Sequence, residues 1–235
     1  MIEATTFFNI LDNIKQKPKR IFTLDSAHPS AGELMQRLNE RDEKSFIGIL
    51  FANPHIPYVR NEILSSLEYF HHRSGGNFDF YCCGYGAYWP ENQYSDQKIV
   101  TSVDGVDWFF SQQSFAEVVT SFEECTKWKY SGETELLLLD VNKSKTTKTK
   151  PVIDSAVILN LELMQQDKAI TSARSLFEKI IRFAKDKDGR GAFEFSDAAG
   201  IDSAKQTIKT AILGLLPSTV ASGYLKTENF AVREI

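Results

Sequence analysis

The residues best placed to do chemistry in this sequence are His55 and Tyr58, which flank Pro57 at the expected start of a helix. A helix N-terminus carries partial positive charge and free N–H groups, so it can bind an anion or a partner. An imidazole and a phenol cannot form a dithiol, which excludes thiol–disulfide exchange at this position. Two interpretations stay open: a binding site, or a loop retained only for structure.

Two adjacent cysteines, Cys82 and Cys83, end an apolar segment. Neighbouring side chains in a strand point to opposite faces of a sheet, and a disulfide between them would be strained. We expect one of them to pack in the core and the other to lie under a helix or near the following loop. A reactive thiol at Cys83 is the alternative. Three cysteines in total, including Cys125, do not make a disulfide framework.

The other histidines lack the spacing of metal ligands. His71 and His72 are adjacent near a helix end, and adjacent helical residues do not face one another. His28 precedes Pro29 in a turn. The sequence therefore predicts no metal site and no cofactor. It also contains no Walker motif, no dinucleotide-binding glycine motif after a strand and no Gly-x-Ser-x-Gly.

Aromatic residues gather in the segment that follows the two cysteines. Tyrosine and tryptophan are enriched at protein interfaces because they bury a large area at low entropic cost. We therefore predict a binding surface that combines this segment with the start of the helix, and packing of the aromatics against the sheet is the alternative. The predicted binding residues are His55, Tyr58, Tyr85, Tyr88 and Trp89.

Composition describes an ordinary globular protein. The chain has 235 residues, 42% of them hydrophobic, and a net charge of −4, which argues against a general nucleic-acid binder. No apolar run reaches the length of a membrane span, and the first residues do not form a secretory signal, so we expect a cytoplasmic location and no membrane. Four lysines in the polar loop 142–150 could bind phosphate or an acidic partner, or simply be solvated.

The elements that must position these residues alternate between strands and helices. The seven-residue apolar run 46–52 predicts a buried strand, and Pro57 suits the first turn of the helix that follows. A second helix is predicted to start at Ser114, with Glu117 completing a capping box. The expected strands are 21–24, 46–52, 77–83, 99–103, 136–141 and 156–164; the other expected helices are 4–16, 30–42, 57–73, 167–185 and 202–216, and 192–195 is expected to be extended.

This order of elements, over residues 20–185, resembles the thioredoxin fold. Thioredoxins carry Trp-Cys-Gly-Pro-Cys where this chain has Pro54-His55-Ile56-Pro57-Tyr58, so the proline aligns and both cysteines are replaced. Helical crossovers predict that the first three strands are parallel, with 46–52 central, and that the last two are antiparallel. Two features depart from the family: Glu133-Thr134-Glu135 stands where it has a cis-proline, and residues 84–113 form a longer connection. A flavodoxin-like doubly wound domain is the alternative fold.

The sequence thus predicts an α/β protein with a mixed sheet flanked by helices. We expect an N-terminal helix and linker (1–19), a thioredoxin-like domain (20–186, with an insertion at 84–113) and a C-terminal helical extension (187–235) packed on it. The predicted function is a redox-inactive module that binds a protein partner, with no catalytic residue and an undetermined oligomeric state. The alternative is an enzyme with a site at the carboxyl ends of the strands, near His55, Asp79 and Cys83.

Overall fold

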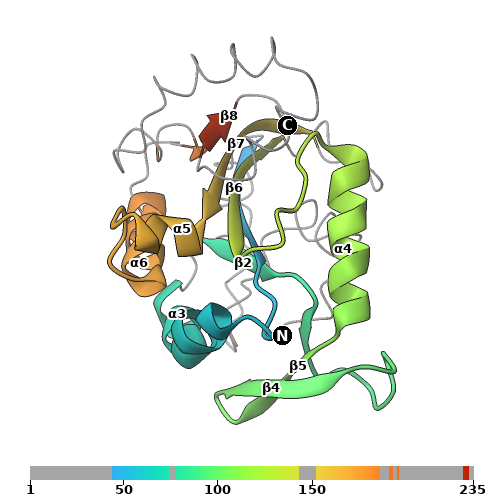
Figure 1. Cartoon of the computed structure of the whole chain (residues 1–235). Coiled ribbons are helices and arrows are strands. Elements are labelled where there is room, and N and C mark those ends of the chain that lie inside the picture. Colours follow the sequence, from blue (N-terminus) through green and yellow to red (C-terminus); the bar gives the residue numbers. More distant parts are fainter. Residues whose placement is uncertain are drawn as a thin grey trace, which may run out of the picture.

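The computed structural model describes residues 44–74, 78–142, 152–185, 191–192, 195 and 230–232. These residues form a five-stranded mixed sheet with helices on both faces and a three-stranded sheet beside it (Figure 1). The helices predicted at 4–16, 30–42 and 202–216, the strand predicted at 21–24 and the four lysines of the predicted loop lie outside the described residues.

The bounds of β1, β2 and β6 lie within a few residues of the predicted strands, whereas other elements differ from the prediction. The strands are β1 (Lys44–Phe51), β2 (Asp79–Cys82), β3 (Tyr85–Ala87), β4 (Lys98–Val103), β5 (Val106–Phe110), β6 (Glu135–Asn142), β7 (Ile153–Asn160) and β8 (Phe230–Val232). The helices are a π-helical turn η1 (Val59–Ile63), a 3₁₀ turn η2 (Leu64–Ser66), α3 (Leu67–Ser74), α4 (Gln112–Cys125), α5 (Leu161–Gln166) and α6 (Ala173–Lys185).

The main sheet has the strand order β2-β1-β6-β7-β8. β1 and β2 are parallel, as the helix between them requires, and β6 and β7 are antiparallel to their neighbours. Of the three strands predicted to be parallel, 46–52 and 77–83 are confirmed as a parallel pair, and 21–24 lies outside the described residues. The predictions of an antiparallel hairpin and of a mixed sheet flanked by helices are also confirmed. β1 is an interior strand, although β6 occupies the middle of the described sheet.

Side chains of β1 alternate between the two helical layers. Phe46 contacts Phe183 of α6 at 6.1 Å between ring centroids, whereas Phe51 contacts Phe122 of α4 at 5.7 Å on the other face. Figure 1 shows the same arrangement, with α4 on one side of the sheet and α3, α5 and α6 on the other. Each fully buried side chain of this size stabilises the fold by about 1.5–3 kcal/mol.

Gly48 makes room for an aromatic stack on the α6 face. It pairs with Phe80 across β1 and β2, and a Cβ on Gly48 would lie 2.8 Å from the Phe80 ring. Phe80 in turn stacks on Phe177 of α6, which stacks on Phe70 of α3, with centroids 4.7 and 4.5 Å apart. The glycine in an otherwise bulky strand thus allows α3 and α6 to share one core with the sheet.

The segment 84–113 is more regular than the sequence suggests. It contains the antiparallel sheet β3-β5-β4, in which the expected strand 99–103 and the Asp104-Gly105 turn form a hairpin with β5. The interpretation of the first part as an aromatic loop is wrong at β3. Three-residue β3 is too short for a period-two pattern to be recognised, and only its pairing with β5 defines it.

One predicted helix start and one predicted strand end require correction because a polar side chain nearby caps a helix. α4 is capped by Ser111, whose Oγ accepts from the backbone N–H of Ser114 at 3.1 Å, so Ser114 lies inside the helix. The strand predicted at 156–164 ends at Asn160. There the Asn160 Oδ1 accepts from the N–H of Leu163 at 3.1 Å, and residues 161–164 turn into α5.

Two further boundaries differ from the prediction. The helix expected at 167–185 begins only at Ala173, because α5 ends at Gln166 and a turn separates the two helices. Ala192 and Phe195, expected in an extended piece, are helical, and the Phe195 N–H donates to the Gly191 carbonyl at 3.0 Å. Both side chains are buried. Short apolar runs do not distinguish strand from helix by periodicity alone, which explains the error.

Candidate functional site

The loops that carry the predicted site meet at the carboxyl ends of β1 and β2. The Cys83 N–H donates to the Leu50 carbonyl at 3.0 Å, and the buried Tyr85 hydroxyl donates to the Ala52 carbonyl at 2.7 Å. The Asn53 amide donates to the Gln112 side chain at 2.8 Å, which ties the loop to the first residue of α4. In α/β sheets this end of the strands commonly forms the ligand site.

The loop after β1 is a closed turn that presents His55 to solvent. The Ile56 N–H donates to the Asn53 carbonyl and the His55 N–H to the Asn53 side-chain oxygen, both at 3.0 Å. Arg60 Nη1 donates to the carbonyls of Pro54 and His55 at 2.8 and 3.0 Å. Hydrogen bonds from Asn53 and Arg60 thus hold the backbone of this turn, and the His55 imidazole that it carries is exposed to solvent.

Tyr58, the second predicted residue of this loop, is half-buried. Its hydroxyl donates to the Leu161 carbonyl at 3.4 Å. Burial raises the pKa of Tyr58 well above its ordinary value, and the carboxylates of Glu62 and Glu162 raise the pKa further. The phenol therefore stays protonated near neutral pH and acts as a hydrogen-bond donor, not as a base.

The aromatic segment divides into packed and exposed members. Tyr85 is buried, and Trp89 is only 6% exposed, packing against Tyr94 at 4.9 Å between ring centroids. The Trp89 indole lies so close over Gly86 that a Cβ there would be 1.9 Å from its Nε1. Tyr88 is 54% exposed and has a φ of 59°, a left-handed conformation that is rare for an aromatic residue. Of the predicted binding residues, His55 and Tyr88 are therefore the exposed ones.

Both adjacent cysteines are buried. Neither of them therefore presents an accessible thiol, whether it lies in the core or near the loop. Burial raises the pKa of Cys82 to about 12 and raises that of Cys83 well above its ordinary value. Asp79 is the first residue of β2 and Cys83 follows its last. The two lie about 13 Å apart at the usual strand rise, so Asp79 belongs to the opposite end of the sheet.

A buried carboxyl group at this end of the sheet was not found by sequence reasoning. Glu135 pairs with Phe51 at the start of β6, is 4% exposed, and accepts a hydrogen bond from Trp128 Nε1 at 3.0 Å. Burial raises its pKa to about 7, a value at which it can gain or lose a proton under physiological conditions. The pKa of half-buried Tyr130 is also raised, mainly by burial and in addition by the charge of Glu135. In the sequence, the only sign of this buried carboxyl group is that Glu135 directly precedes the apolar run 136–139.

Tyr58 and the start of β6 are joined through one short chain of contacts. The Leu161 carbonyl accepts from Tyr58, and the Leu161 N–H donates to the Thr134 carbonyl at 3.0 Å. The Thr134 hydroxyl donates to Glu162 Oε1 at 2.9 Å. Thr134, which directly precedes β6, therefore links the start of this strand to the region around the predicted loop.

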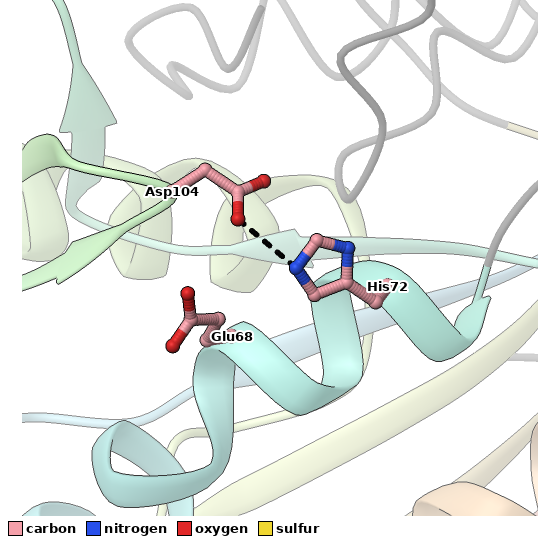
Figure 2. A group of neighbouring side chains, drawn as sticks. All are labelled: Glu68, His72 and Asp104. Atoms are coloured by element: carbon pink, nitrogen blue, oxygen red, sulfur yellow. Dashed lines mark ion pairs between the residues drawn. The ribbon is translucent and has the colours of Figure 1, made fainter.

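Apart from the region at the ends of β1 and β2, a group of side chains that could hold a metal ion lies at α3. Glu68, His72 and Asp104 each offer a ligand atom, and these atoms lie within 4.8 Å of one another (Figure 2). The prediction of no metal site rests on the spacing of the histidines, which cannot reveal this group because Asp104 comes from the distant β4–β5 turn. Only the fold reveals this neighbourhood.

Comparisons of the chain with protein-family models, with curated proteins and with solved structures find no match. In the part of the chain that the structure describes, no helix is both long and apolar enough to cross a membrane.

Proposed function

We propose that this chain is a redox-inactive, thioredoxin-like domain that binds a protein partner. Three features support the fold: β1 and β2 are parallel, β6 and β7 form an antiparallel pair, and helices lie between and after them in the order that the resemblance implies. His55 and Tyr58 occupy the place of the family's two cysteines.

The state of the thiols supports the absence of redox chemistry. Disulfide exchange requires an accessible thiolate. Cys82 and Cys83 are buried, and their raised pKa values keep them protonated. Half-buried Cys125 lies on α4 and has no second cysteine beside it among the described residues.

The observation that carries the binding function is the exposure of two large apolar side chains in the segment that forms the small sheet. Tyr88 and Ile99, at 54% and 57% exposure, are the large exposed hydrophobic side chains of the described residues. Ile99 lies opposite Phe109, which lies opposite Gly86, so these three positions share the face that Trp89 covers, and Tyr88 follows β3 next to Trp89 in the chain. A protein partner would cover the exposed Tyr88 and Ile99 side chains, since exposed large apolar residues can mark an interface.

The test is affinity capture from the native host followed by reconstitution with the purified partner. We expect the double variant Tyr88→Ser/Ile99→Ser to bind the partner at least about tenfold more weakly, since each loses a large apolar contact. Glu124→Ser, an exposed change on α4, is the matched control. Equal binding by the wild type and the double variant would exclude this surface and the function built on it.

An enzyme is the second candidate, and the pKa of Glu135 is the observation that favours it. A carboxyl group that titrates near pH 7 suits general acid–base catalysis. The test is incubation with a small-molecule extract of the host and detection of converted compounds by mass spectrometry. Conversion that is lost in Glu135→Gln and kept in Glu124→Gln supports the enzyme; conversion by neither wild type nor variant removes it.

A further inference from the structure

The cluster of Glu68, His72 and Asp104 joins α3 to the tip of the β4–β5 hairpin. We propose that these three side chains bind one divalent transition-metal ion of the class of Zn²⁺. The ion would connect the hairpin, which carries Ile99 on its outer face, to the helical layer of the main sheet. This site is separate from the thioredoxin-like loop and does not depend on the proposed function.

The backbone brings the ligands to one place from two elements. Glu68 and His72 are four residues apart on α3 and therefore share a face of the helix. Asp104 lies at the turn between β4 and β5 with a φ of 51°, and its Oδ1 is 3.0 Å from His72 Nε2. Figure 2 shows the Asp104 carboxylate directed toward the His72 imidazole, whereas the Glu68 carboxylate, on the same helix as His72, points away from the ring.

A second imidazole faces the same carboxylate. His71 Nε2 lies 3.4 Å from Asp104 Oδ2, so each oxygen of Asp104 faces a different histidine. The side chain of His71 is buried, whereas that of His72 is exposed. The contact with His71 orients the Asp104 carboxylate through Oδ2. Carboxylates that bind metal ions are commonly oriented by such a second contact.

The donor set selects the class of ion. One imidazole nitrogen and two carboxylate oxygens suit Zn²⁺ and its neighbours, whereas Mg²⁺ and Ca²⁺ prefer oxygen donors alone. Bonds of about 2.1 Å place tetrahedral ligands about 3.4 Å apart. The three ligand atoms now lie within 4.8 Å of one another, so metal binding would draw them closer, with Glu68 turning toward His72 and Asp104. Three protein ligands leave a coordination position for water, and two carboxylates balance the charge of the ion.

An ion pair between a protonated His72 and the two carboxylates would use the same residues without a metal. The two arrangements differ in a measurable way, because only the metal site gives a saturable signal with added Zn²⁺. The test uses the full chain, stripped with a chelator and dialysed, and titrated calorimetrically with Zn²⁺ at pH 7.5.

We expect one Zn²⁺ per chain, and a dissociation constant at least about tenfold higher in His72→Ala and in Asp104→Asn. Asp107→Asn removes a carboxylate from the same hairpin outside the cluster and is the matched control. Circular dichroism establishes that each variant is folded. Absence of saturable binding, or equal affinity in Asp104→Asn and Asp107→Asn, would overturn the proposal.

Substitution by Co²⁺ supplies a second readout that separates this site from the cysteines. We expect the visible d–d bands of a nitrogen- and oxygen-liganded Co²⁺ in the wild type and their loss in His72→Ala. A thiolate-to-metal charge-transfer band that persists in His72→Ala would assign the bound ion to a cysteine and overturn the proposal.

Discussion

Glu135 is the residue whose environment has the clearest consequence for stability. Its pKa of about 7 in the folded protein lies above its ordinary value of 4.5, so folding favours the protonated form. The stabilisation is fully present below about pH 4.5, falls as the pH rises through 7, and is lost above it. The difference between the two pKa values corresponds to about 3 kcal/mol.

Replacing Glu135 by glutamine removes this pH dependence. We expect Glu135→Gln to be more stable than the wild type at pH 8 by as much as about 3 kcal/mol, because no charge is buried and Trp128 Nε1 keeps an acceptor. Urea unfolding at pH 5 and pH 8 measures the effect, with Glu124→Gln as an exposed control. A variant less stable than the wild type at pH 8 would show that the buried carboxylate is well solvated or paired.

Trp89 tests whether the aromatic segment is core or surface. Because its indole is buried over Gly86, Trp89→Ala should lower the free energy of unfolding by about 3 kcal/mol. Exposed Tyr88→Ala should change it by less than about 0.5 kcal/mol. Chemical denaturation of both variants decides the matter. Equal stability of the two would restore the prediction that Trp89 is a partner anchor.

At the level of residues, the sequence does not separate exposed from buried members of the aromatic segment. The Tyr85 side chain is buried, and its hydroxyl donates to the Ala52 carbonyl, which lies far away in the sequence, just after β1. That His55 and Tyr58 replace two cysteines is implied by the resemblance and stays a prediction. Asp104 approaches His72 through a hairpin that no local pattern places.

Among the elements, α4 shows how a cap decides a boundary. Ser111 accepts from the Ser114 N–H and also donates to Asp96 Oδ1 at 2.6 Å. We expect Ser111→Ala to lower the free energy of unfolding by about 1 kcal/mol or more. The Ser114 hydroxyl is buried and makes no hydrogen bond within the described residues, so Ser114→Ala should be neutral or slightly stabilising. Thermal unfolding of the two variants compares them directly; a larger loss for Ser114→Ala would contradict the assignment.

The elements that could be predicted are those whose apolar runs are long and continuous. β1 and β6 were found within a few residues because both faces of each strand are buried. β7 was extended too far, because Leu161–Met164 is as apolar as the strand and only the Asn160 cap separates them. β3 and β5 were missed because their order is set by pairing across the sheet.

For the molecule as a whole, the absence of an accessible thiol pair predicts a functional result. The protein should not accelerate the reduction of insulin by dithiothreitol above the uncatalysed rate, since exchange needs an exposed thiolate. Turbidity of the insulin chains provides the assay, and a thioredoxin provides the positive control. Acceleration that disappears in Cys83→Ser would show that this thiol becomes accessible and that the redox-inactive proposal is wrong.

The edge strand of the described sheet next to β7 is β8, which comes from residues 230–232. Ala156, Val157 and Ile158 of β7 pair with residues 230–232 of β8, which lies beside β7 at the edge of the sheet in Figure 1. A chain that ends at residue 229 would leave β7 as an edge, with a row of unpaired backbone groups and apolar side chains.

We therefore expect deletion of residues 230–235 to destabilise the protein and to promote self-association. Loss of three paired residues at about 1 kcal/mol each should lower the melting temperature by roughly 5–10 °C. Deletion of residues 233–235 alone keeps β8 and is the matched control. Scanning calorimetry and light scattering at several protein concentrations measure both effects. If the two deletions behave alike, β8 adds nothing to the sheet, and β7 must tolerate the edge position without it.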